Sequence, residues 1–161
     1  MKKYKWMIIL INLAIVLSLF HISMSKKETL LSDGTLVLLE LAPVDPRSLI
    51  QGDYMDLRYA IARDGNNDDI GKRGYIVVTI NDIGVAQKVR IQSSTTPKSE
   101  GEYLINYTKE SWNMNIGSES FFFQEGEGEK YEKAEYGGVK IDNEGNSLLI
   151  GLYDEKLNLI E

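Results

Sequence analysis

An apolar segment near the N-terminus is the most continuous hydrophobic run in the chain. Residues 7–22 are apolar except at three positions, Asn12, Ser18 and His21. A bilayer-spanning helix usually needs about 17–25 residues, so this run alone is slightly short. Extension to Ser25, with the flanking lysines reaching outward to the interface, makes up the difference. The pattern therefore predicts a transmembrane helix, in which Asn12 is a candidate for packing against a second helix.

Charge around this segment predicts its orientation. Three lysines and the terminal amine precede it, whereas two lysines follow it. We therefore expect residues 1–27 to be a cytoplasmic stub and signal anchor, with residues 28–161 outside the cytoplasm, in the periplasm if the cell has one. A cleaved signal peptide has a similar beginning. Ser23-Met24-Ser25 would be a small-x-small site, but lysines follow it at once, so we expect an uncleaved anchor.

The rest of the chain has the short periodicity of β-strands. Residues 35–42 are mostly apolar, as in a strand covered on both faces. Residues 52–62 alternate instead, which places Met55, Leu57, Tyr59 and Ile61 on one face and Tyr54 on the other.

Turn-forming residues divide the remaining strands into hairpins. One hairpin is expected to join residues 75–80 and 85–91 through Asn81-Asp82-Ile83-Gly84. A second is expected to join residues 139–142 and 147–152 through a similar turn that ends at Asn146. Weaker strands are predicted at residues 102–107, 112–116 and 120–124, and one short helix at 128–136. This order predicts a mainly β domain, a small antiparallel barrel or sandwich with one short helix.

Composition excludes several kinds of site. Residues 26–161 hold 15 basic and 24 acidic side chains, a net charge of −9, which argues against binding to nucleic acid. The chain has no cysteine, so disulfides and thiolate nucleophiles are excluded. Its only histidine, His21, lies at the end of the apolar segment, so neither a Ser-His-Asp triad nor a multi-histidine metal site can form. We expect no cofactor and no metal site.

One motif in the chain is specific. Gly52-Asp53-Tyr54-x-x-Leu57-x-Tyr59 follows a constrained segment that contains Pro43, Asp45, Pro46 and Arg47. Farther along, three phenylalanines precede an alternation of glutamate and glycine at residues 121–128. This combination resembles the GDYXXLXY domain family, with every fixed position of the naming motif present. The resemblance implies a small membrane-anchored bacterial protein of no established biochemical function. Genes of that family are often found beside multi-span membrane proteins, which suggests subunits of membrane assemblies.

The motif residues allow two interpretations each. Asp53, if partly buried, needs a partner such as Arg47, and it then either locks a turn or acts as an acid–base or ligand-binding group. Tyr54 is either an interface residue or a cross-strand packing partner. Pro43–Arg47 forms a rigid segment near the membrane that could touch a partner.

Three functions follow from these observations. We expect a non-enzymatic accessory subunit that docks on an integral membrane protein through residues 43–59. An extracytoplasmic binder or sensor of a small ligand is the alternative. A Ser/Lys hydrolase similar to signal peptidases is weaker, because Ser48 lacks the expected preceding motif and neither Lys72 nor Lys88 is expected to be buried. The oligomeric state does not follow from the sequence.

Overall fold

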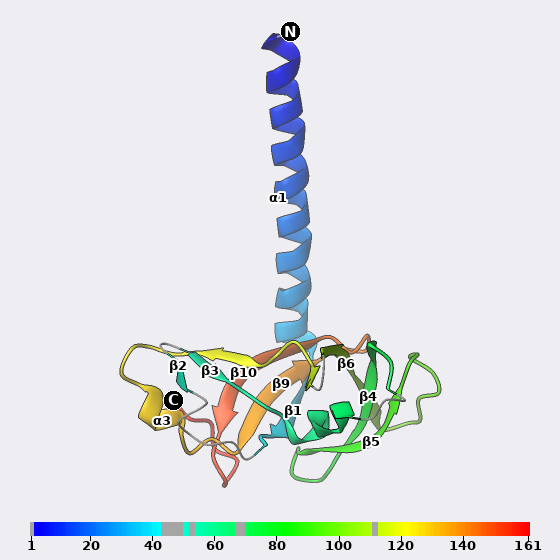
Figure 1. Cartoon of the computed structure of the whole chain (residues 1–161), viewed down its shortest axis with the longest axis vertical. Helices are drawn as coiled ribbons and strands as arrows, with labels where there is room; N and C mark the ends of the chain where they lie inside the picture. The colour runs from blue at the N-terminus through cyan, green and yellow to red at the C-terminus, as the bar shows by residue number, and fades with distance from the viewer. Residues whose placement is uncertain (1, 43–49, 52–53, 67–69, 111–112) are drawn as a thin grey trace.

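A long helix and a β domain make up the chain in the computed structural model, which describes residues 2–42, 50–51, 54–66, 70–110 and 113–161. Helix α1 (Lys2–Asp33) rises from one side of the domain (Figure 1). It is long and apolar enough to span a membrane, and its apolar stretch has no protein around it. The alternating and apolar patterns beyond it form a mainly β fold, as predicted.

Within these described ranges, ten strands form three sheets, and every strand pair is antiparallel. The first sheet has the order β1-β9-β10, from β1 (Thr35–Glu40), β9 (Tyr136–Ile141) and β10 (Ser147–Tyr153). The second has the order β2-β3-β8, from β2 (Ile50–Gln51), β3 (Tyr54–Asp56) and β8 (Ser120–Phe122). The third has the order β5-β4-β6-β7, from β5 (Ala86–Gln92), β4 (Arg73–Ile80), β6 (Glu102–Glu110) and β7 (Asn113–Asn115). Together they curve into half a barrel and not a closed one (Figure 1).

The core takes buried side chains from all three sheets. Val37 and Leu39 of β1 are fully buried and Leu38 between them nearly so, which confirms the prediction that this strand is covered on both faces. Ile76 and Ile105, from the neighbouring strands β4 and β6, are also fully buried. A parallel bridge between Leu38 and Val85 connects the first sheet with the third. The domain is therefore held together mainly by apolar packing between short sheets.

The strand predicted at residues 52–62 differs from the observed structure. Among the described residues of this range, β3 is the one strand, and a 3₁₀ helix, η1 (Ala60–Asn66), takes up the end of the predicted strand. The four predicted inward residues, Met55, Leu57, Tyr59 and Ile61, are nevertheless all buried. An isolated bridge from Tyr59 to Leu41 keeps the chain beside the first sheet after β3 has ended. The predicted helix at 128–136 is also shorter, because α3 covers only Gly128–Tyr131.

The two predicted hairpin turns share one hydrogen-bonding design. In the first turn, Asn81 Oδ1 accepts from the backbone N–H groups of Ile83 and Val85, and Gly84 has a φ of 86°. In the second, Asp142 Oδ1 accepts from the N–H groups two and four residues later, and Gly145 has a φ of 88°. The side-chain oxygen thus satisfies backbone donors that the tight turn leaves free.

Replacing Gly84 by alanine should destabilise the domain by about 1–2 kcal/mol, because an L-residue there must adopt a left-handed conformation. A Cβ atom at this position meets nothing within 4 Å, so the expected loss is conformational and not steric. Urea unfolding of the full-length protein in detergent micelles would measure it. Gly71→Ala is the matched control, since its Cβ would make only an ordinary contact of 3.5 Å. Equal stability of the two variants would contradict the expectation.

The last turn of α1 is built into the domain. Leu30 is buried in the domain, and the N–H of Gly34 donates to the Leu30 carbonyl at 3.0 Å. The ammonium of Lys140, on β9, donates to the carbonyl of Leu31 and, at 3.4 Å, to that of Ser32. A cation at the C-terminal end of a helix satisfies its free carbonyls and opposes its negative dipole end. The helix therefore continues directly into β1 without a flexible linker.

Candidate functional site

The motif residues divide into a buried set and an exposed set. Leu57 and Tyr59 are each only 2% exposed and lie in the core, whereas Tyr54 is 37% exposed on the outer face of β3. Seven other residues singled out above lie outside the described residues, namely Pro43, Asp45, Pro46, Arg47, Ser48, Gly52 and Asp53. In the described part of the motif, two side chains are therefore buried in the core and one aromatic side chain faces outward.

Tyr59 is fixed by a hydrogen bond to a loop that sequence reasoning did not single out. Its hydroxyl donates to the backbone carbonyl of Ser118 at 2.5 Å, in a buried environment. Burial raises the pKa of Tyr59 above its usual value, and the nearby Glu119 carboxylate adds to this rise. A Cβ atom at Gly137 would lie 2.9 Å from the Tyr59 ring, so glycine at that position leaves room for it. Tyr59 thus works as a neutral structural donor.

The loop at residues 116–119 connects the motif with the first sheet. The Glu119 carbonyl accepts from the N–H of Leu57 at 2.6 Å, just beyond β3. The Glu119 side chain accepts from the N–H of Ile116 and, at 3.3 Å, from that of Gly117. Ser147, at the start of β10, donates to the Ile116 carbonyl at 2.6 Å and also receives a hydrogen bond from the Ser118 hydroxyl at 3.1 Å. The sequence offers no periodic signal for this loop, which is why it was missed.

Removing the Tyr59 hydroxyl should measure how strongly this loop is held. Tyr59→Phe leaves the ring in place but deprives the buried Ser118 carbonyl of its donor, a loss of about 1–2 kcal/mol of unfolding free energy. Thermal or urea unfolding in micelles would report it. Tyr103→Phe is the control, because Tyr103 is only partly buried against the core. If Tyr59→Phe were as stable as the wild type, the hydrogen bond would contribute nothing to the fold.

Glu119 is a half-buried carboxylate in an acidic setting. Burial raises its pKa above the ordinary 4.5, and the neighbouring Asp56 raises it further. The backbone N–H groups of Ile116 and Gly117 oppose this rise, since they favour the charged form. The ionised side chain therefore costs the folded state free energy near neutral pH.

The stability difference between wild type and Glu119→Gln should depend on pH. Because the folded-state pKa of Glu119 is raised, the folded protein binds a proton more readily than the unfolded chain. The wild type should therefore gain stability relative to the glutamine variant as pH falls from neutral toward about 4.5, and the difference should level off below that value. Urea unfolding at several pH values would measure it. A flat difference, or one of opposite sign, would contradict the raised pKa.

The three consecutive phenylalanines point to opposite sides of the chain at β8. Phe121 and Phe123 pack on Tyr131 of α3, with ring centroids 4.9 and 5.5 Å apart. Phe122 lies on the other face, 74% exposed, beside Tyr54, with their centroids 5.9 Å apart. These two residues are directly paired across β3 and β8. The outward half of the motif is thus extended by a second aromatic ring from the later aromatic segment.

A small pocket of about 250 Å³ lies beside the buried half of the motif. Two guanidinium and two carboxylate side chains line it, together with Tyr59; these are Arg58, Arg63, Asp56 and Glu119. Asp56 is the described carboxylate of the motif segment that lines this pocket, while Asp53 lies outside the described residues. Both signs of charge at one opening fit a polar ligand better than an apolar one.

The described residues do not form a metal-binding group, and the lysines considered for catalysis take ordinary positions. Within the ranges given above, no group of three or more histidine, aspartate or glutamate side chains is placed to hold a metal ion. Lys72 is exposed, and Lys88 is partly buried and donates to the carbonyl of Ile61 at 3.2 Å. Asn12 lies in the exposed apolar part of α1.

Comparison with known proteins identifies the family. The family model described as GDYXXLXY protein matches residues 16–152, which is most of the chain. No curated protein and no solved structure matches. The matched region begins inside α1 and continues into β10, so it covers the second half of α1 and most of the β domain. The chain therefore belongs to the GDYXXLXY family.

Proposed function

We propose that this protein is a membrane-anchored, non-enzymatic accessory subunit that contacts an integral membrane protein. Helix α1 would cross the cell membrane, the inner one where there are two, with the N-terminus in the cytoplasm and the β domain outside it. The lysine-rich N-terminus supports this orientation.

The observation that carries the proposal is the direct connection between α1 and the domain. Leu30 is buried in the domain, and Lys140 binds the carbonyl end of the helix. A domain joined in this way stays beside the bilayer that its helix crosses. The extracytoplasmic surfaces of other membrane proteins lie at the same distance from the bilayer. The domain could therefore contact such a partner without a long linker between α1 and β1.

Two parts of the chain would contact such a partner. In the membrane, Asn12 is a polar side chain on an otherwise apolar helix, where a hydrogen bond to a second helix is favourable. Outside it, residues 43–59 include the exposed Tyr54, and exposed aromatic rings are typical of interface centres. The buried Leu57 and Tyr59 would hold this segment in place.

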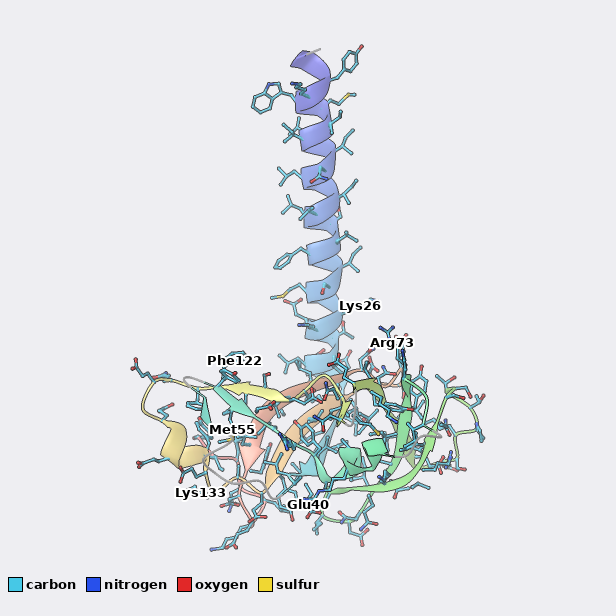
Figure 2. All side chains as sticks on the ribbon, viewed as in Figure 1. Lys26, Glu40, Met55, Arg73, Phe122 and Lys133 are labelled. Carbon is cyan, nitrogen blue, oxygen red and sulfur yellow. The ribbon has the colours of Figure 1, made fainter. Side chains whose placement is uncertain are left out.

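Crosslinking in intact membranes would test the proposal. Full-length tagged wild type should recover a stoichiometric integral membrane protein, identified by mass spectrometry, and Tyr54→Ala or Arg47→Ala should reduce its yield. Lys133→Ala is the matched control, since Lys133 is exposed on the side of the domain opposite to Phe122, the cross-strand partner of Tyr54 (Figure 2). Recovery of this chain alone would overturn the accessory-subunit function.

The pocket beside the motif supports a second candidate function, an extracytoplasmic binder of a small polar ligand. Its lining combines Arg58 and Arg63 with Asp56 and Glu119 in about 250 Å³, a volume suited to a molecule of amino-acid size or smaller. A thermal-shift screen of small zwitterions and carboxylates with the full-length protein would test it. A ligand that raises the melting temperature of the wild type but not of Arg58→Gln would support binding there, and a screen without any such ligand would exclude this chemistry.

A further inference from the structure

Phe122 is the most exposed large apolar side chain among the described residues of the β domain. It is 74% exposed, compared with 60% for Ile83, the next in order. Tyr54 packs against it from the neighbouring strand, with the two ring planes tilted by 41°. Contact with the Tyr54 ring therefore holds the Phe122 side chain in a defined position. A ring exposed to this degree in water loses the free energy that burial would provide.

Phe122 lies on the side of the domain from which α1 rises. Figure 2 shows Phe122 and Arg73 on this side and Glu40 and Lys133 on the opposite one. Phe122 comes from β8 and Arg73 from the beginning of β4, so two different sheets contribute to the same face. An aromatic ring and a guanidinium group are both typical of the interface between lipid and water.

The length of α1 brings this face to the level of the lipid headgroups. A hydrocarbon core roughly 30 Å thick takes about 20 helical residues, which places its outer boundary near Ser25 if Trp6 marks the inner one. Leu30, five residues farther along, is already buried in the domain. At about 1.5 Å per residue, the domain begins roughly 8 Å beyond the hydrocarbon, which is about the thickness of the headgroup layer.

We infer that this face rests on the bilayer, with the Phe122 ring in the interfacial layer and Arg73 beside the lipid phosphates. The inference rests on the proposed membrane anchor but not on any protein partner. The net charge of −9 beyond residue 25 would be repelled by anionic lipids, so a zwitterionic phospholipid surface is the occupant that fits. Lipid contact at Phe122, away from the α1 attachment, would restrain the tilt of the domain and so set which surface is offered to a partner.

The absence of cysteine makes the test direct, since single cysteines can be introduced without removing others. Full-length Phe122→Cys, Arg73→Cys, Glu40→Cys and Lys133→Cys would each carry a nitroxide label in nanodiscs of phosphatidylcholine. Accessibility to oxygen, which concentrates in lipid, would be compared with accessibility to a water-soluble nickel chelate. We expect a higher oxygen-to-nickel ratio at position 122 than at positions 40 and 133, with position 73 between them. All four positions are exposed, so labelling should not disturb folding.

The possible results distinguish the lipid contact of Phe122 from the membrane insertion of α1. Equal ratios at positions 122 and 133 in a reconstituted protein would overturn the lipid contact and leave the anchor intact. Shielding of position 122 from both reagents would also overturn it, since a second copy of the chain would then cover the ring. A chain that fails to enter nanodiscs would overturn the anchor, and with it both the proposed function and the lipid contact.

Discussion

Leu57→Ala should lower the free energy of unfolding by about 2–5 kcal/mol, the usual cost of emptying a buried leucine site. Leu57 is only 2% exposed, and it lies in the same core cluster as Met55 and Tyr59. Its backbone N–H is held by the Glu119 carbonyl, so the chain cannot easily move in to fill the cavity. Urea unfolding of the full-length protein in micelles, followed by circular dichroism, would measure the loss.

Tyr54→Ala is the matched variant for this prediction. It changes the same motif three residues away, but on the exposed face. Substitutions there usually change the free energy of unfolding by roughly 0.5 kcal/mol. Loss of the aromatic pair with Phe122 should add ~0.5–1 kcal/mol. The two variants should therefore separate a structural role from a contact role within one motif. Equal destabilisation by both would mean that the whole motif serves the core, and the docking role proposed for Tyr54 would lose its support.

The sequence predicted burial in the motif better than it predicted backbone conformation. Alternation placed Met55, Leu57, Tyr59 and Ile61 together, and all four are buried. It also implied one continuous strand, whereas η1 replaces the end of that strand. Over so few residues, a strand with alternating side chains and a short 3₁₀ turn can both direct the same side chains into the core. Periodicity therefore reports which side chains face inward more reliably than it reports the element that carries them.

Turn chemistry was predictable only where glycine marked it. The turns at Asn81 and Asp142 each contain a glycine of positive φ, and both were predicted. A third turn of the same design begins at Asp154, whose carboxylate accepts from the N–H groups of Lys156 and Asn158. Its residue of positive φ is Leu157, with a φ of 62°. Without glycine at that position, the sequence gives no signal for the turn.

The contacts that position the candidate site are long-range and were not predictable from local patterns. Tyr59 bonds Ser118, 59 residues away, and Lys140 bonds the end of α1 across 109 residues. Neither partner stands out in the sequence, because serine and lysine are residue types that usually lie at the surface. The family resemblance identified the motif, but it could not show that the motif is divided between the core and the surface.

Gly34→Ala should loosen the connection between α1 and the domain, at a cost of about 3 kcal/mol, the upper end of the usual range for overpacking. A Cβ atom at this position would lie 2.3 Å from the Leu30 carbonyl oxygen and 3.2 Å from Cβ of Lys140. The first of these is a backbone atom that cannot move aside without opening the last turn of the helix. That opening would also displace the carbonyls that Lys140 binds. The domain would then no longer be held at one height and angle.

Electron–electron distance measurements in nanodiscs would detect this change. With nitroxides on Lys26→Cys in the helix and Lys133→Cys in the domain, the otherwise wild-type chain should give one narrow distance distribution. Adding Gly34→Ala should broaden it, because the helix and the domain would take several relative orientations. Gly71→Ala, which has room for its Cβ and lies far from the junction in sequence, should leave the distribution narrow. A narrow distribution in the Gly34 variant would show that the buried Leu30 alone fixes the junction, and a broad one in the parent chain would remove the rigid connection on which the proposed function depends.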